Sequence, residues 1–129
     1  MKTTTVFLSA ATTVMAILLA NSPEADAFVL NQPTNYTIQW YNDTSPASPC
    51  SFISVRTLSS NGSVISEKTN NYGTELAHRR TLIIDIPSAG CSAMKLTAKC
   101  GQNSGTRDIG CSSGMAVING LNPPVIDFR

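Results

Sequence analysis

The stretch that decides the fold is TLIIDIPSAGCSAMKLTAKC, residues 81–100. A period of two runs through both of its halves, which is the period of a β-strand rather than of a helix. The turn residues PSAG, at positions 87–90, separate the two halves. In the second half one face carries Met94, Leu96, Ala98 and Cys100, and the other carries Ala93, Lys95, Thr97 and Lys99. This pattern predicts a half-buried central strand with a cysteine near each end.

The N-terminal segment predicts a secretory signal peptide over residues 1–27. Lys2 supplies a positive charge, residues 6–20 form an apolar run, and Ala25-Asp26-Ala27 has the form of a cleavage site. The apolar run is shorter than the roughly 20 residues that a membrane-spanning helix needs. We therefore expect a secreted mature chain that begins at Phe28 and forms a single domain, residues 28–129.

The charge of the mature chain argues against two kinds of partner. Eight Lys or Arg face six Asp or Glu, which leaves a net charge of about +2. That charge is too small to favour nucleic acid or an anionic membrane surface. The chain ends in a polar segment at Arg129, so we expect no stable membrane anchor. The sequence carries no signal for an oligomeric state.

All four cysteines, Cys50, Cys91, Cys100 and Cys111, lie in the predicted mature part. Secretion places them in an oxidising compartment, where two disulfides are the expected outcome. A zinc site is disfavoured because the chain has no C-x₂-C pair and a single histidine, and we expect neither a metal nor a cofactor. Four cysteines allow three pairings. We favour Cys50–Cys91 with Cys100–Cys111, since a long-range link and a hairpin-scale link together constrain the unfolded chain.

Strand-like runs separated by turn residues continue along the rest of the chain. Residues 34–41 alternate, and we expect Trp40 to lie in the core with Tyr36 and Ile38 on the same face. Asn61-Gly62, between the runs 51–60 and 63–68, predicts a hairpin with a type I′ turn. Loops are expected at 42–49 and 69–80, and short strands at 106–112, 115–118 and 125–128.

Seven or eight short strands without a helix-period stretch predict an all-β fold. The expected architecture is a small antiparallel two-sheet β-sandwich, held by two disulfides.

Three N-x-S/T sequons predict a glycoprotein, with Asn35, Asn42 and Asn61 as the acceptors. Asn42 is expected in a loop and Asn61 at the hairpin tip, where a glycan is tolerated. Asn35 is expected on the outward face of its strand.

The sequence offers few residues that could form a catalytic site. His78 is the only imidazole, which excludes an acid/base scheme with two histidines. A small secreted ribonuclease would use Glu75 as the base, His78 as the acid and Arg79 on the phosphate. These residues fall in one predicted polar loop, so we favour a solvated loop over an active site. The dibasic pair Arg79-Arg80 fits a processing site, but we favour two charges that flank the hydrophobic strand.

The order of the short motifs resembles a known family. These motifs are YTIQW at 36–40, ISVRTL at 53–58, a polar stretch with Asn71 and Gly73, and IDIP at 84–87. Together they resemble the Y-x-I-x-W … V-x-L … I-P layout of the fungal yeast-cell-wall-synthesis, Ser-Thr-rich anchored domain, over residues 36–87. The resemblance implies an Ig-like or fibronectin-like sandwich with a role in β-glucan assembly at the wall. The chain departs from the family where Ile84-Asp85 replaces a usual Trp, and it has no Ser/Thr-rich stalk, so no functional residue carries over.

The sequence therefore predicts a secreted, non-catalytic protein that acts by binding at a cell wall or host surface. Its expected partner is a cell-wall polysaccharide or an extracellular or host protein. Two alternatives stay open. One is a host-directed secreted effector or toxin-like protein in the same compartment, and the other is the small ribonuclease or hydrolase built on Glu75 and His78.

Overall fold

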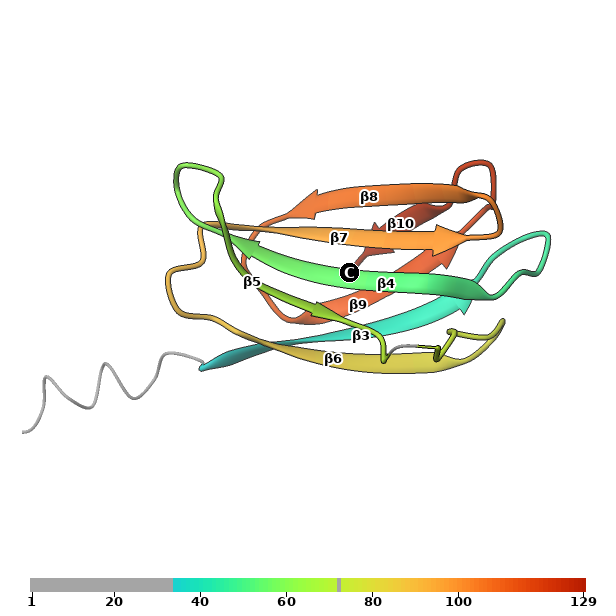
Figure 1. Cartoon of the computed structure of the whole chain (residues 1–129), viewed down its shortest axis with the longest axis horizontal. Helices are drawn as coiled ribbons and strands as arrows, with labels where there is room; N and C mark the ends of the chain where they lie inside the picture. The colour runs from blue at the N-terminus through green and yellow to red at the C-terminus, as the bar shows by residue number, and fades with distance from the viewer. Residues whose placement is uncertain (1–33, 72) are drawn as a thin grey trace, which may run out of the picture. The chain divides into compact units, whose positions relative to one another are not determined.

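The computed structural model describes residues 34–71 and 73–129, so the predicted signal peptide and its cleavage site lie outside the described residues. The described residues form eight strands and no helix (Figure 1). In chain order these are β3 (Asn35–Asp43), β4 (Cys50–Leu58), β5 (Val64–Thr69), β6 (Thr81–Pro87), β7 (Ala93–Cys100), β8 (Asn103–Ile109), β9 (Gly114–Asn119) and β10 (Val125–Phe128).

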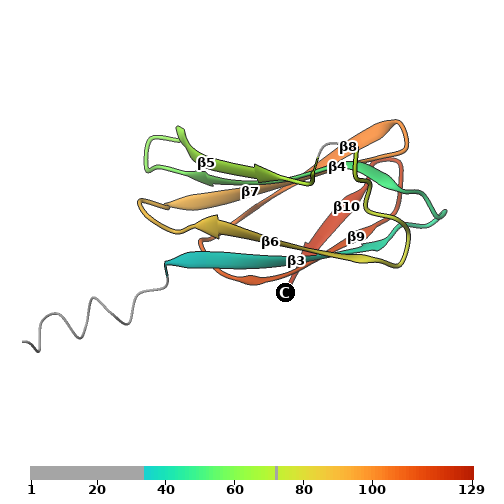
Figure 2. The ribbon, with the colours of Figure 1, turned by 60° about the horizontal axis from the view of Figure 1, so that its bottom comes forward.

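The strands form two four-stranded sheets that pack face to face as separate layers (Figure 2). Sheet A has the order β10-β9-β3-β6, and sheet B has the order β5-β4-β7-β8. The predicted all-β sandwich with two disulfides is confirmed. One pair departs from the expected antiparallel pattern, because β3 and β9 run parallel. The chain crosses from sheet B to sheet A after β8, and β9 then runs in the same direction as β3.

The core lies between the inward faces of the two sheets, as the alternation of the strands predicts. Met94, Leu96 and Ala98 of β7 are fully buried, and Trp40 is also fully buried. On the opposite face of β7, Lys95 and Thr97 are half-buried and Lys99 is exposed. Since β7 lies between β4 and β8, the prediction of a half-buried central strand is confirmed, and so is the core position of the tryptophan.

The hairpin of β4 and β5 forms at Asn61-Gly62, but with a different turn from the one predicted. Gly62 has a φ of 87°, whereas Asn61 is not among the residues with positive φ. The Gly62 amide donates to the Ser59 carbonyl at 2.9 Å, and the Ser59 amide donates to the Ser63 carbonyl at 2.8 Å. A type I turn followed by a glycine bulge therefore joins the strands, because only one residue takes the left-handed conformation.

The disulfides are Cys50–Cys100 and Cys91–Cys111, so the predicted pairing of Cys50 with Cys91 and of Cys100 with Cys111 is wrong. The reason is the length of β7. Cys91 precedes the strand and Cys100 ends it, which separates them by roughly 30 Å along an extended chain. The antiparallel neighbour β4 brings Cys50 opposite Cys100. The antiparallel neighbour β8 returns Cys111 to the end where Cys91 lies.

The two ends of the sandwich differ in their connections (Figure 1). One end, which we call the loop end, carries the connections 44–49, 70–80, 101–102 and 120–124 together with Cys50–Cys100. The other, the turn end, carries the shorter set 59–63, 88–92 and 110–113 together with Cys91–Cys111. Cis peptide bonds precede Pro46 and Pro123, both at the loop end.

Candidate functional site

An exposed aromatic ring lies beside a hollow at the loop end of sheet B. Phe52, on β4, is 38% exposed, although most of the large apolar side chains around it on this strand are buried. The hollow has a volume of about 320 Å³ and is lined by Ser51, Phe52, Thr69, Asn70, Asn71 and Gly73. Its walls therefore combine one apolar ring with hydroxyl and amide groups, a mixture that is typical of small-molecule sites.

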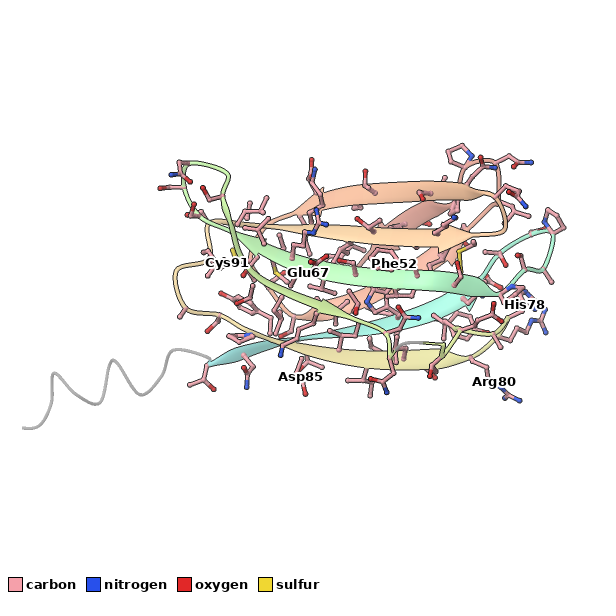
Figure 3. All side chains as sticks on the ribbon, in the orientation of Figure 1. Phe52, Glu67, His78, Arg80, Asp85 and Cys91 are labelled. Carbon is pink, nitrogen blue, oxygen red and sulfur yellow. A yellow bond between two sulfur atoms is a disulfide. The ribbon has the colours of Figure 1, made fainter. Side chains whose placement is uncertain are left out.

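A bulge at the start of β4 sets the direction of the Phe52 ring. The ladder between β4 and β7 shifts between Cys50 and Phe52, so that Cys50 pairs with Cys100 and Phe52 pairs with Lys99. The following residue, Ile53, is fully buried. Since neighbouring side chains alternate between faces, Phe52 points to the outer face of sheet B (Figure 3).

Asn70 builds the floor of the hollow by joining the loop to β4. Its Oδ1 accepts from the Ile53 amide at 3.0 Å, and its Nδ2 donates to the Ser51 carbonyl at 3.1 Å and to the Thr74 carbonyl. The amide is therefore fully engaged with backbone groups and acts as a positioning residue. The exposed hydroxyls of Ser51 and Thr69 on the rim have no hydrogen-bond partner within the described residues, which leaves them free to meet a ligand.

The loop behind the hollow is fixed although it contains no regular structure. Leu76 forms an isolated bridge with Cys50, with 2.9 Å hydrogen bonds in both directions, and its side chain is buried. The Asn42 Nδ2 donates to the Leu76 carbonyl at 2.9 Å and to the Ser48 carbonyl at 2.8 Å. The Asn42 Oδ1 accepts from the Thr44 amide at 3.0 Å. One buried side chain thus ties two loops of the loop end together.

Asn42 is not the loop residue that the sequon suggested. It lies within β3 and is fully buried, so the predicted loop position is wrong. A glycan on Nδ2 would displace at least one of its two hydrogen bonds and would have no room in the folded protein. Asn35 and Asn61 are exposed, at the start of β3 and in the hairpin turn, and their glycosylation stays a prediction.

Charged side chains form a row across the middle of the outer face of sheet B. Arg56 of β4 donates to Glu67 of β5 at 2.9 Å, and Lys95 of β7 lies 3.8 Å from Asp108 of β8. The hydrogen bond from the Arg56 guanidinium lowers the pKa of Glu67 below its usual range, and the hydrogen bond from Ser54 acts in the same direction. Each cation of this row has a carboxylate partner. All four side chains are at least 37% exposed, so each pair contributes little to stability.

The residues considered for a ribonuclease lie at the loop end but do not form a catalytic group. Glu75 and Arg79 are exposed and His78 is half-exposed. Figure 3 shows His78 near the connection into β6. No hydrogen bond or ion pair joins any two of them within residues 34–71 and 73–129. A base and an acid that act on one substrate need defined mutual positions, and this structure does not give them that.

A second, smaller hollow lies on the other side of the same loop. Its volume is about 150 Å³, and its walls come from residues 74–77 and 80–82 together with Asn70. Leu76 and Leu82 make much of this lining apolar, and Glu75 and Arg80 carry opposite charges at its edge. The dibasic pair is exposed, and Arg79 has a φ of 62°. The interpretation of this pair as two charges that flank the hydrophobic strand stays a prediction, with a processing site as the alternative.

Two absences among the described residues bear on the site. No three His, Cys, Asp or Glu side chains lie close enough together there to hold a metal ion. Within the same part of the chain, no helix has the length and apolar character that crossing a membrane requires.

Comparison with known proteins adds a single structural likeness. Neither a protein-family model nor a curated protein matches the sequence, so the family resemblance over residues 36–87 stays a prediction. A solved structure of pneumolysin is similar to this chain with a TM-score of 0.42 and 12% identity. The match covers 74% of this chain and 23% of that protein.

Sequence reasoning named none of the residues that line the larger hollow as a site. Phe52 begins a strand that the sequence predicts, but its exposure follows from the bulge beside Cys50. A weak signal was present, because Phe52 and Ile53 are consecutive apolar residues and only one of two neighbours in a strand can face the core. The contribution of Asn70 depends on a contact between a loop and a strand that lie 17 to 19 positions apart.

Proposed function

We propose that this protein is a secreted, non-catalytic β-sandwich that binds a polysaccharide of a cell wall or host surface at the Phe52 hollow. The observation that carries the proposal is the exposed Phe52 ring, which borders a hollow of about 320 Å³ whose other walls are hydroxyl and amide groups. An aromatic ring offers a flat apolar face with a π system. The C–H face of a sugar ring packs against such a surface, while its hydroxyls need nearby donors and acceptors.

The surroundings of the hollow support binding rather than turnover. The hydroxyls of Ser51 and Thr69 lie at the rim next to the ring. A row of hydroxyl residues continues from there across the outer face of sheet B, namely Thr69, Ser54, Thr97 and Thr106. Within this row Ser54 is buried and donates to Glu67. Among the residues that the structure describes, no carboxylate or histidine lines the hollow, so the groups that glycoside hydrolysis requires are absent from this part of its lining. The two disulfides fit the extracellular compartment in which such a polysaccharide lies.

The test is a binding screen of the purified protein against β-glucan, chitin and acidic polysaccharides, with Phe52→Ala and Val64→Ala as matched variants. Val64 is more exposed than Phe52, at 53%, and lies on the same sheet near its turn end. Phe52→Ala should weaken binding by about tenfold, which corresponds to the loss of one aromatic contact. Val64→Ala should leave the affinity unchanged.

Two results would contradict the proposal. Equal affinities of the wild type and Phe52→Ala would show that the ring is not the contact surface. Breakdown of a polysaccharide or of RNA that His78→Ala abolishes would replace the binding protein with a hydrolase.

A further inference from the structure

The cations on the outer face of sheet B fall into two groups. Arg56 and Lys95 have the carboxylate partners Glu67 and Asp108, at 2.9 and 3.8 Å. Lys99 lies four positions after Lys95 on the same strand and the same face, and it is exposed. Within the described residues no carboxylate lies within ion-pair distance of Lys99. Lys99 is therefore the cation of these two central strands whose charge is not compensated locally.

Lys99 stands directly beside the proposed site. It pairs with Phe52 across the ladder of β4 and β7, and with Ser104 across the ladder of β7 and β8. Side chains of directly opposed residues lie about 5 Å apart at their Cβ atoms and share one face of the sheet. The Lys99 ammonium is thus within reach of a ligand that covers the Phe52 ring.

The groups that line the hollow are neutral. They are hydroxyl, amide, glycine and aromatic residues. In the neighbouring row of hydroxyl residues on the sheet, Ser54 donates to Glu67, and the charge of this carboxylate is compensated by Arg56. Glu75, the acid of the adjoining loop, lines the other hollow together with Arg80. The local charge at the Phe52 end of sheet B is therefore positive, and the field of an exposed cation extends over about 10 Å at moderate ionic strength.

We infer that the polysaccharide bound at Phe52 is anionic, with an acidic substituent of the sugar ring held by the Lys99 ammonium. The inference rests on the proposed function and narrows its ligand to a class, the glycans that bear carboxylate or sulfate groups. The Phe52 ring supplies the contact that any sugar ring can use, and Lys99 supplies the discrimination between acidic and neutral glycans.

The experiment compares four proteins, the wild type, Lys99→Gln, Lys95→Gln and Phe52→Ala, by affinity gel electrophoresis. The probes are polygalacturonate, a sulfated galactan and a neutral β-glucan, so that carboxylate and sulfate are distinguished. Thermal melts confirm that each variant is folded. Lys95→Gln is the matched control, because it removes a lysine of the same strand and face that already has a carboxylate partner.

The wild type should bind at least one acidic glycan more tightly than the neutral glucan. Lys99→Gln should weaken that binding about fivefold and leave binding of the neutral glucan unchanged, while Lys95→Gln should change both by less than twofold. The preference for the acidic glycan should vanish in about 0.5 M NaCl, where charge interactions are screened.

The outcomes separate the inference from the function on which it rests. If Phe52→Ala weakens glycan binding but Lys99→Gln does not weaken binding of the acidic probes, the inference is wrong and the proposed function stands. Equal affinity of the wild type for the neutral and acidic probes would likewise show that the inference is wrong while the proposed function stands. If the wild type binds none of the three probes, or Phe52→Ala binds as tightly as the wild type, both are wrong.

Discussion

The loop end and the turn end of the sandwich achieve order by different means. At the turn end the connections are short, and local hydrogen bonds such as those between Ser59, Gly62 and Ser63 define them. At the loop end the longer connections are held by single asparagine side chains, Asn42 and Asn70, that reach from one segment to the backbone of another. The candidate site lies at the loop end, because long connections create hollows and asparagine side chains bonded to the backbone fix them in shape.

The largest expected difference between the two ends concerns their disulfides. Cys50 and Cys100 are 50 positions apart, and Cys91 and Cys111 are 20 positions apart. Replacing the first pair by alanine should cost about 4 kcal/mol, and replacing the second pair about 3 kcal/mol, since the longer loop restricts the unfolded chain more. Chemical denaturation of the two double variants measures both. If the loss of the Cys91–Cys111 pair lowered the free energy of unfolding more, the fold would not depend more strongly on the disulfide at its loop end.

Two glycines, one within β8 and one just after it, compare how closely the two ends are packed. A Cβ on Gly105 of β8 would lie 2.0 Å from the Pro124 carbonyl oxygen in the connection to β10, whereas a Cβ on Gly110 would meet nothing within 4 Å. Gly105→Ala should therefore destabilise the protein by about 3 kcal/mol, because the backbone of the neighbouring segment has to move. Gly110→Ala at the turn end should change the stability by no more than about 0.5 kcal/mol. Similar melting temperatures for the two variants would show that the approach of residue 124 is not a constraint.

Two sequon asparagines, one near each end, test how much their side-chain hydrogen bonds to the backbone stabilise the loops. Asn42→Ala removes three hydrogen bonds from a fully buried site and leaves the Thr44 amide without its partner, so it should cost about 2–3 kcal/mol. The Asn61 Oδ1 accepts from the Ser63 amide at 3.0 Å on the surface, and Asn61→Ala should cost less than about 1 kcal/mol. Protein made without glycosylation allows the comparison by thermal melting. If Asn61→Ala lowered the melting temperature more than Asn42→Ala, the local turn would contribute more to stability than the long-range contacts of Asn42.

The smallest expected effect on stability concerns the Arg56–Glu67 pair, which lies between the two ends. The pKa of Glu67 is lowered from 4.5 in the folded protein, so its pairing contributes stability above that value and the contribution is lost as pH falls through the folded pKa. The side chains are 41% and 37% exposed, so the contribution is no more than about 0.5 kcal/mol. Denaturation of the wild type and Glu67→Gln at pH 7 and pH 3 measures it. The free energies of unfolding of the two proteins should differ at pH 7 and become equal at pH 3. A difference that grows toward pH 3 would show that the pairing does not lower the pKa of Glu67.

The disulfide pairing, which the sequence analysis predicted wrongly, could have been derived from the sequence. The turn at residues 101–102 makes β7 and β8 a hairpin in which Cys100 pairs with Asn103 and Met94 with Ile109. Extending this register by three residues brings Cys91 close to Cys111. The pairing could therefore have been predicted from the symmetry of the hairpin, whereas the preference for one long-range link and one hairpin-scale link led to the wrong partners. The burial of Asn42 had no such signal, since a sequon and a neighbouring proline-rich segment both indicate a surface loop.

The sequence by itself determined the presence of the strands, their inward faces and the place of the hairpin turn between β4 and β5. Each of these depends on neighbours in the chain: alternation directs Leu96 and Trp40 into the core, and Asn61-Gly62 reverses the chain. Only the tertiary structure decided that β3 and β9 run parallel, that Asn42 and Asn70 anchor loops, and that Phe52 lies beside both a hollow and Lys99. These features depend on which distant segments become neighbours, and that choice is made by the packing of two complete sheets against each other rather than by any local pattern.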